Sequence, residues 1–246
     1  MARLKFMIAG VSGSGKSTSL MNLTPQEGVL YLNMEATKPL PFPNKFKKPT
    51  KALKATQVFN AFTQAEADPT IHTIVIDTIS FMMDMFESQE VLTSTNTQHG
   101  WQLYQQFYKE LQQTYIANSS KNVILLAHNV EELTPQGELK TYVKVKGALA
   151  VQGLEAYESI VVYTMKKTID ELEAFGYDPN LLHITDEDRE NGFKHVFQTR
   201  VTKDMVNSRL RTPLNLFTRQ QTYIDNDVAM LLTYLENYYG IGSNRT

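Results

Sequence analysis

The feature that most constrains the fold of this chain is a nine-residue segment near its start, Gly10-Val-Ser-Gly-Ser-Gly-Lys-Ser-Thr18. It follows an apolar run, Phe6–Ala9, and precedes a short helical pattern over about residues 17–23. Glycines at this spacing let successive backbone N–H groups converge on one anion, and the N-terminus of the next helix adds a favourable dipole. The pattern therefore predicts a strand, a phosphate-binding loop and a helix. The alternative is a glycine-rich turn without a ligand.

The residue types in this loop also predict how a nucleotide is held. Lys16 can reach the β- and γ-phosphates of ATP, and the Ser17 hydroxyl can ligate Mg²⁺. The motif does not fix the reaction, because small-molecule kinases carry the same pattern. We expect ATP to contact Gly10, Ser12, Gly13, Ser14, Gly15, Lys16, Ser17 and Thr18.

Short apolar runs along the chain predict an α/β fold. They are apolar on both faces, as strands buried between two helix layers are, and helical patterns separate most of them. We therefore expect a mostly parallel central sheet flanked by helices. The runs are Lys5–Ala9, Val29–Leu32, Thr73–Ile76, Val123–Leu126 and Ser159–Tyr163.

The last third of the chain departs from this alternation. Phe193–Val201 is typical of a further strand that pairs with residues 159–165 as a mixed, antiparallel extension of the sheet. An acidic stretch over about residues 168–192 is interpreted as a surface insertion, and a C-terminal helix is expected over about residues 225–240. We predict one domain spanning residues 1–246.

Composition excludes several classes of protein. The chain has no cysteine, which removes disulfide scaffolds, thiol catalysis and Cys-ligated zinc. No signal-peptide pattern and no long apolar run is present, so we expect a soluble cytoplasmic protein without membrane contact. The net charge is −2, and basic residues do not dominate the chain as a whole. A nucleic acid would therefore have to be bound by local patches.

Two acidic residues follow predicted strands and are candidates for the reaction centre. Asp77 ends the strand His72–Ile76, where it can hold Mg²⁺ beside the phosphate loop; the alternative is that it caps the next helix. Thr78 follows Asp77, so no second carboxylate stands there to act as a base. Glu35 follows the strand Val29–Leu32 and can orient a water molecule towards the γ-phosphate; the alternative is an ordinary exposed Glu.

A third polar pair follows the strand Val123–Leu126. Either His128 or Asn129 is placed to hydrogen-bond the γ-phosphate and so to sense its presence, and His128 is the preferred candidate. The alternative is a loop histidine with a local partner. The predicted catalytic set is Lys16, Glu35, Asp77, His128 and Asn129.

Taken together, these motifs resemble the RecA-like P-loop ATPase core, and most closely the short phage-encoded RecA-core proteins. The segment Tyr31–Phe42, with its Lys-Pro-Leu-Pro run, is similar to the corresponding segment of those proteins, and the likeness is strongest over about residues 1–165. The resemblance implies Mg²⁺-dependent ATP hydrolysis at a subunit interface of a ring or filament. It also implies coupling to single-stranded DNA in recombination, annealing or replication, in the cytoplasm of a host cell. A single-strand DNA-binding protein is a further implied partner.

The resemblance also implies two DNA-facing loops, at about residues 87–100 and 130–147, and cations that act in a neighbouring subunit. The second loop supplies the DNA-binding candidates Lys140, Tyr142, Lys144 and Lys146. The candidates for the trans-acting cation are Lys203, Arg209 and Arg211. A solvated hairpin and a solvated basic face are the respective alternatives.

Other functions stay open at this point. A small-molecule P-loop kinase would use Glu35 to bind its substrate, but such enzymes bring paired arginines over the phosphates, and residues 61–188 contain no Arg. A nucleotide-gated DNA-binding module with little turnover is the second alternative. A packaging or helicase motor usually has a longer chain.

Overall fold

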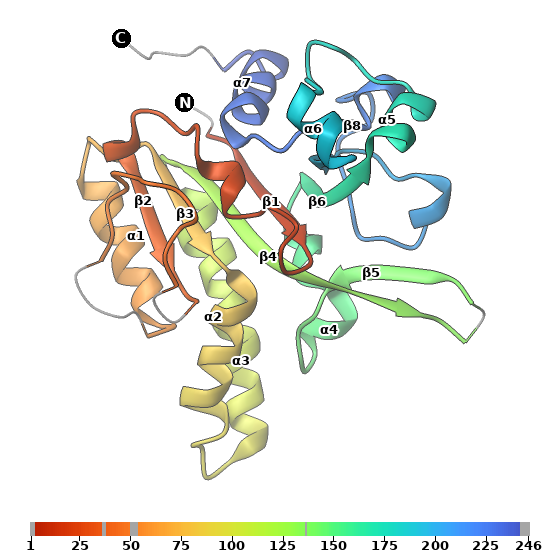
Figure 1. The fold of residues 1–246 in the computed structure, drawn as a ribbon. Coiled ribbons are helices and arrows are strands. Elements are labelled where there is room, and N and C mark those ends of the chain that lie inside the picture. Colours follow the sequence, from red (N-terminus) through yellow and green to blue (C-terminus); the bar gives the residue numbers. More distant parts are fainter. Residues whose placement is uncertain (1–2, 36–37, 50–53, 136, 242–246) are drawn as a thin grey trace.

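The computed structural model describes residues 3–35, 38–49, 54–135 and 137–241. In these ranges the strands form one sheet in the order β2-β3-β4-β1-β6-β7-β8, with β5 paired to β4 (Figure 1). Strands β1, β2, β3, β4 and β6 are parallel to one another. At one edge of the sheet, β7 pairs antiparallel with β6, and β8 pairs antiparallel with β7. The strands are β1 (Lys5–Gly10), β2 (Val29–Asn33), β3 (Thr73–Asp77), β4 (Asn122–Leu133), β5 (Leu139–Val143), β6 (Val161–Thr168), β7 (Phe193–Gln198) and β8 (Tyr223–Asp225).

This mostly parallel central sheet with an antiparallel extension confirms the predicted fold class. The antiparallel pairing of β6 with β7 was also expected from the sequence. Strand β4 lies between β1 and β3, so the carboxyl ends of these three strands meet at one edge of the sheet. Ligands of open α/β sheets bind at this edge.

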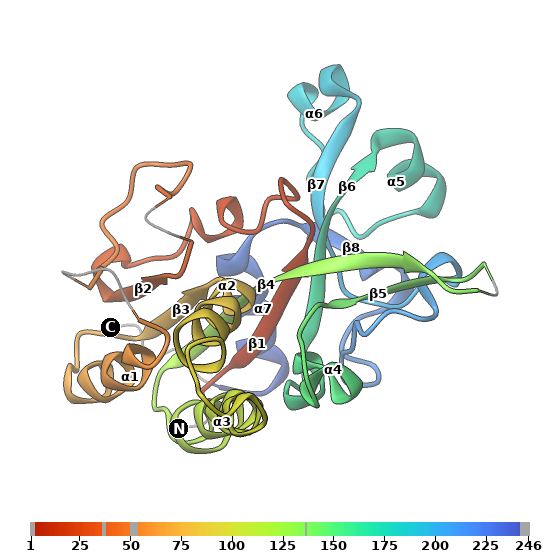
Figure 2. The ribbon, with the colours of Figure 1, turned by 90° about the horizontal axis from the view of Figure 1, so that it is seen from below.

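Helices cover both faces of the sheet because successive side chains of a strand point to opposite faces. Met7 and Ala9 of β1 belong to a core with α1, α2 and α3, whereas Phe6 and Ile8 pack in a second core with α7. Figure 2 shows these layers from below. The helices are α1 (Gln57–Ala67), α2 (Ile79–Phe86), α3 (Thr97–Glu110), α4 (Leu149–Gln152), α5 (Ile169–Phe175), α6 (Asp186–Asn191) and α7 (Val228–Tyr238).

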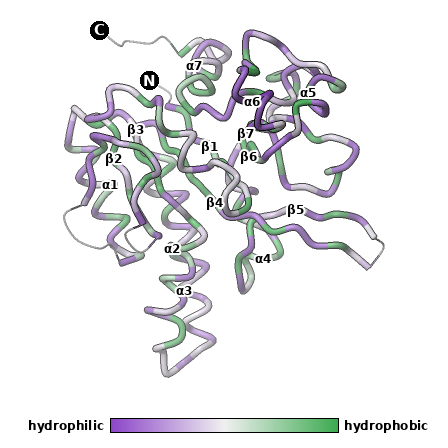
Figure 3. The backbone as a smooth tube through the Cα atoms, in the orientation of Figure 1, coloured by the Kyte–Doolittle hydropathy of each residue, from purple (hydrophilic) through white to green (hydrophobic). Residues whose placement is uncertain are grey.

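Three segments differ from what the sequence predicts. Residues 87–91 and 97–100 are helical, so the first expected loop is mostly a continuation of α2 and the start of α3. The second expected loop forms the hairpin that was its alternative interpretation, because β4 continues past the sheet to Leu133 and pairs with β5. The acidic stretch is only partly a surface insertion. Its helix α6 is strongly hydrophilic (Figure 3), but Leu172 and Leu182 are buried in a small separate core with Val196 and Tyr223.

In the described part of the chain, no helix combines the length and the apolar character needed to span a membrane.

Candidate nucleotide site

The predicted phosphate loop joins β1 to a short 3₁₀ helix, Thr18–Leu20, which is shorter than the helix expected over residues 17–23. Gly15 has a φ of +102°, a conformation that residues with a side chain rarely adopt. A Cβ atom on Gly15 would also lie 2.5 Å from the Asn226 amide nitrogen. Gly10 is packed as closely, since a Cβ there would lie 2.6 Å from the Thr164 carbonyl oxygen. Both glycines are therefore required by close approach of the loop to other strands.

Lys16 is folded back onto the loop. Its ammonium group donates to the carbonyl oxygens of Gly10 and Val11, each at 2.9 Å, and lies 3.3 Å from Nδ1 of His128. The side chain is buried, and burial lowers the pKa of Lys16 to about 8. The amine is therefore held over the loop, in the region where the motif predicts the β- and γ-phosphates.

Asp77 at the end of β3 is close to the loop, as the sequence predicts. Its Oδ2 atom accepts hydrogen bonds from the Ser17 hydroxyl at 2.8 Å and from the Tyr31 hydroxyl at 2.6 Å. Burial raises the pKa of the Asp77 carboxyl. Thr78, whose side chain accepts from the Phe81 amide, caps α2, so the alternative role of Asp77 as the helix cap is wrong.

These residues fit a magnesium ion. The second carboxylate oxygen of Asp77, Oδ1, is buried and has no hydrogen-bond partner among the described residues. Those residues contain no group of three or more His, Asp or Glu side chains suited to hold a metal. Mg²⁺ does not need such a group, because it is commonly bound by one or two carboxylates together with the phosphates of its nucleotide. Ser17 and Asp77 are the residues that would hold it.

Glu35 and His128 meet at the same edge of the sheet. His128 Nε2 lies 3.0 Å from Oε1 of Glu35, and Lys38 is 3.6 Å from the other carboxylate oxygen of Glu35. The backbone of His128 is fixed by a hydrogen bond from its N–H to the Ser80 hydroxyl at 2.9 Å, and the Phe81 ring packs against the imidazole edge to face. His128 therefore contacts both Lys16 and Glu35.

A pocket of about 190 Å³ connects these groups. Of the two candidates in β4, at the point where its pairing with β1 ends, His128 lines the pocket and Asn129 does not, because neighbouring residues of a strand point to opposite faces. The Lys-Pro-Leu-Pro segment contributes Lys38, Pro39 and Pro41 to its wall. The remaining lining residues are Ser12, Gly13, Gly15, Lys16, Ser17, Thr18, Tyr31, Glu35 and Asp77.

Three further residues hold the phosphate loop from the C-terminal part of the sheet. The Thr164 hydroxyl of β6 and the His195 imidazole Nδ1 of β7 contact the Ser14 carbonyl oxygen at 2.7 Å and 2.8 Å. Asn226, just after β8, donates from Nδ2 to the Gly15 carbonyl oxygen at 2.9 Å. We call Thr164, His195 and Asn226 the loop clamp. Sequence reasoning missed it, and no local pattern marks it, because each residue lies at least 150 positions from its partner.

The DNA-binding candidates lie on or near the β4–β5 hairpin. The Lys140 ammonium lies 5.0 Å from the centre of the Tyr142 ring, and the Arg209 guanidinium lies 5.4 Å from it. Lys146 forms an ion pair of 2.8 Å with the buried Glu87. Among the four candidates, Lys144 is exposed and has no ion pair with a described residue.

The candidates for a trans-acting cation do not line the nucleotide pocket of their own chain. Arg209 is 3.5 Å from the buried Glu155 and contacts the Tyr142 ring. Arg211 is exposed and lies 3.5 Å from the Ala156 carbonyl oxygen. Lys203 is exposed and lines a different pocket, beside α5. Their action in a neighbouring subunit stays a prediction.

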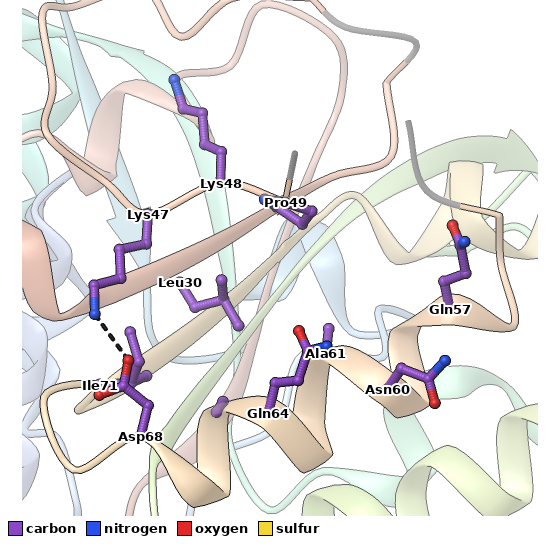
Figure 4. A pocket seen from close by; sticks show the side chains of 11 residues that line it. Leu30, Lys47, Lys48, Pro49, Gln57, Asn60, Ala61, Gln64, Asp68 and Ile71 are labelled. Carbon is purple, nitrogen blue, oxygen red and sulfur yellow. Dashed lines mark hydrogen bonds and ion pairs between the residues drawn. The ribbon is translucent and has the colours of Figure 1, made fainter. Parts of the chain in front are cut away.

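A separate pocket of about 420 Å³ lies between the segment Lys47–Pro49 and α1 at the outer edge of the sheet (Figure 4). Its wall carries the amide side chains of Gln57, Asn60 and Gln64, and Lys47 is paired with Asp68 at 2.9 Å. No residue lines both this pocket and the nucleotide pocket.

A family model and solved structures are similar to this chain. A family model described as an AAA domain matches residues 2–153, more than half of the chain. Among solved structures, a KaiC-like protein of the archaeon Pyrococcus horikoshii is similar, at 10% identity and a TM-score of 0.44, covering 82% of this chain and 81% of that one. No curated protein matched the sequence. Since the family match contains the phosphate loop, Glu35, Asp77 and His128, the chain belongs to this family of AAA domains.

Proposed function

We propose that the protein hydrolyses ATP with Mg²⁺ at the pocket formed by the phosphate loop, and that hydrolysis is coupled to single-stranded DNA. The observation that carries the first part is the set of contacts at the edge of the sheet. Ser17 meets Asp77, while His128 bridges Lys16 and Glu35. A simple glycine-rich turn would not require these groups to converge from the segments at β1, β2, β3 and β4.

Each side chain has a distinct task in this proposal. The loop N–H groups and Lys16 bind the triphosphate, and Ser17 with Asp77 would hold Mg²⁺, which supplies positive charge against the phosphate oxygens. Tyr31 fixes the orientation of the Asp77 carboxylate through its 2.6 Å hydrogen bond. Glu35 orients a water molecule and accepts its proton as it attacks the γ-phosphate.

His128 connects the triphosphate to this base. If Nε2–H donates to Glu35, the other ring nitrogen is left as an acceptor for the Lys16 ammonium, which matches the two observed contacts. A γ-phosphate that draws Lys16 away from His128 would release this contact. The position of the imidazole, and with it that of Glu35, would then depend on the nucleotide.

Coupling to DNA is the less direct part of the proposal. It is supported by the continuity of β4, which carries His128 at the pocket and runs on into the hairpin with Lys140 and Tyr142. A strand of DNA on this hairpin would meet exposed lysines beside an aromatic ring. The same proposal includes a role in phage-type recombination, annealing or replication. It also includes assembly into a ring or filament and a cation that acts in the neighbouring subunit. A single-strand DNA-binding protein is its further partner.

Turnover of ATP by the purified protein, with and without oligodeoxythymidylate, tests both parts. We expect Glu35→Gln to lower turnover at least 100-fold while the Kd for ATP changes less than threefold, because the base is lost but the loop is intact. Lys16→Ala should lose ATP binding. Glu27→Gln, an exposed glutamate before β2, is the matched control and should be unchanged.

The outcomes separate the alternatives. Full turnover in Glu35→Gln would refute the assignment of the base. Turnover that responds to a nucleoside or sugar and not to DNA would identify a kinase. ATP-dependent DNA binding with negligible turnover would identify a nucleotide-gated binding module.

A further inference from the structure

The C-terminal extension of the sheet has two faces with different surroundings. The register pairs Thr164 with Phe197 and Phe197 with Ile224, so these residues share one face. It is the face that carries the loop clamp, since alternate residues of a strand point the same way. Residues of the other face, Val196 and Tyr223, pack with Leu172 of α5. One face of β6, β7 and β8 therefore lies against the phosphate loop, and the other lies against α5.

A pocket of about 680 Å³ opens beside α5 on this second face. Its volume falls in the range of about 300–1,000 Å³ that is usual for small-molecule sites. Four cationic side chains line it, one from β6 and three from the connection between β7 and β8: Lys167, Arg200, Lys203 and Arg219. We call this the extension pocket.

The charges of the extension pocket are unbalanced. Lys167 is paired with Glu171 at 3.1 Å. Among the described residues, no acidic side chain forms an ion pair with Arg200, Lys203 or Arg219, and Asp204 is the other acid in the wall. The pocket wall therefore carries three cations without an ion pair to a described residue and one carboxylate, that of Asp204, in the same state. Such a pocket favours an anion with more than one negative charge.

Several of these cations are held in place before any ligand binds. The Arg219 guanidinium lies 5.7 Å from the centre of the Phe175 ring, and Lys167 lies 5.6 Å from the centre of the Tyr223 ring. Arg200 donates from one guanidinium nitrogen to the Phe217 carbonyl oxygen, which leaves its other nitrogens available. Held guanidinium groups suit phosphate, whose oxygens accept two parallel hydrogen bonds.

We propose that the extension pocket is a second anion site that binds a compact phosphorylated molecule of about nucleotide size, separate from the phosphate loop. The concave shape favours a compact ligand over a DNA strand, which would require cations spaced along an open groove. The placement of Lys203 in this pocket gives it a role in its own chain. The proposal does not depend on ATP hydrolysis, and each can fail without the other.

Calorimetric titration of inorganic tripolyphosphate into the full chain tests this site. The background is Lys16→Met, in which the phosphate loop lacks its cation, so that binding at the extension pocket dominates. We expect Lys203→Gln/Arg219→Gln to weaken tripolyphosphate binding at least tenfold. The control, Lys48→Gln/Lys109→Gln, makes the same change of net charge elsewhere and should stay within twofold. All four positions are lysine or arginine side chains without an ion pair to a described residue.

Equal affinity in the two double variants would overturn the proposal, because the pocket cations would then contribute no more than the general charge of the protein. A second titration uses oligodeoxythymidylate with a 5′-hydroxyl end. If Lys203→Gln/Arg219→Gln lowers the affinity for this oligonucleotide as much as it lowers the affinity for tripolyphosphate, the cations bind a DNA backbone. The proposal of a compact ligand would then be wrong. If the double variant melts early, Lys203→Gln alone should still weaken tripolyphosphate binding about threefold, and no change would refute the site.

Discussion

Replacing Asn226 with aspartate should weaken ATP binding far more than it lowers the maximal rate of turnover. The substitution keeps the size of the side chain but removes the amide group that donates to the Gly15 carbonyl oxygen at 2.9 Å. The Thr164 hydroxyl has one proton for two acceptors, the Ser14 carbonyl oxygen at 2.7 Å and Oδ1 of Asn226 at 3.0 Å, and a carboxylate at position 226 would draw that proton away from Ser14. The change therefore removes the contact of residue 226 with Gly15 and weakens that of Thr164 with Ser14, and it brings two oxygen atoms face to face.

The size of the effect follows from these contacts. A hydrogen bond of this kind contributes about 0.5–1.5 kcal/mol net, and the new repulsion between oxygens adds to its loss. A total of about 1–2 kcal/mol corresponds to a rise of about 5- to 30-fold in the Kd for ATP. Glu35, His128 and Asp77 are not moved by the substitution, so kcat should stay within about threefold of the wild-type value.

Binding of a fluorescent ATP analogue and steady-state turnover measure the two quantities separately. Asn237→Asp is the matched control, because it makes the same chemical change on the exposed side of α7 and should leave both quantities unchanged. If Asn226→Asp binds ATP within twofold of the wild type, the clamp does not position the phosphate loop. An equal fall of kcat and affinity would instead indicate general damage to the site.

Two other substitutions test the surroundings of the site and the core. Tyr31→Phe removes the hydroxyl that fixes Asp77 and should raise the Mg²⁺ concentration for half-maximal turnover about tenfold or more; an unchanged Mg²⁺ titration would refute this role. Burial raises the pKa of Glu158 from 4.5 to about 6. The folded state therefore holds this proton more tightly than the unfolded state, and the free energy of unfolding falls by about 2 kcal/mol as the pH rises from below 4.5 to above 6. Glu158→Gln should therefore raise the melting temperature above pH 7 and flatten its pH dependence, and a wild-type melting profile would contradict this.

The sequence predicted those parts of the molecule that depend on local patterns. Runs such as Thr73–Asp77 are apolar on both faces because both are buried, so the parallel strands and their order of appearance could be anticipated. Ser17 and Asp77 were expected to meet because both belong to segments at the carboxyl edge of a parallel sheet, and the structure places them 2.8 Å apart. The catalytic roles of Glu35 and His128 stay predictions.

What the sequence did not predict depends on contacts between distant segments. Thr164, His195 and Asn226 reach the phosphate loop only because β6 pairs with β1, β7 pairs with β6 and β8 pairs with β7. Nothing in their own neighbourhoods distinguishes them from other polar residues at strand ends. The sequence offered the hairpin only as an alternative to a DNA-facing loop, because residues 129–133 are mostly polar where β4 leaves the core and so lack the apolar signal of a buried strand.

The loop clamp also bears on how far the nucleotide site extends along the chain. The family match ends at residue 153, yet all three clamp residues come after it, at positions 164, 195 and 226. Strand β6, which pairs with β1 from Met7 to Ala9, likewise lies beyond the match. A phosphate loop needs its carbonyl groups turned outward for its N–H groups to face the phosphates. Here the C-terminal extension supplies partners for the carbonyls of Ser14 and Gly15. The matched segment therefore contains the groups to which we assign binding and reaction, while two carbonyls of its phosphate loop have their partners in the remainder of the chain.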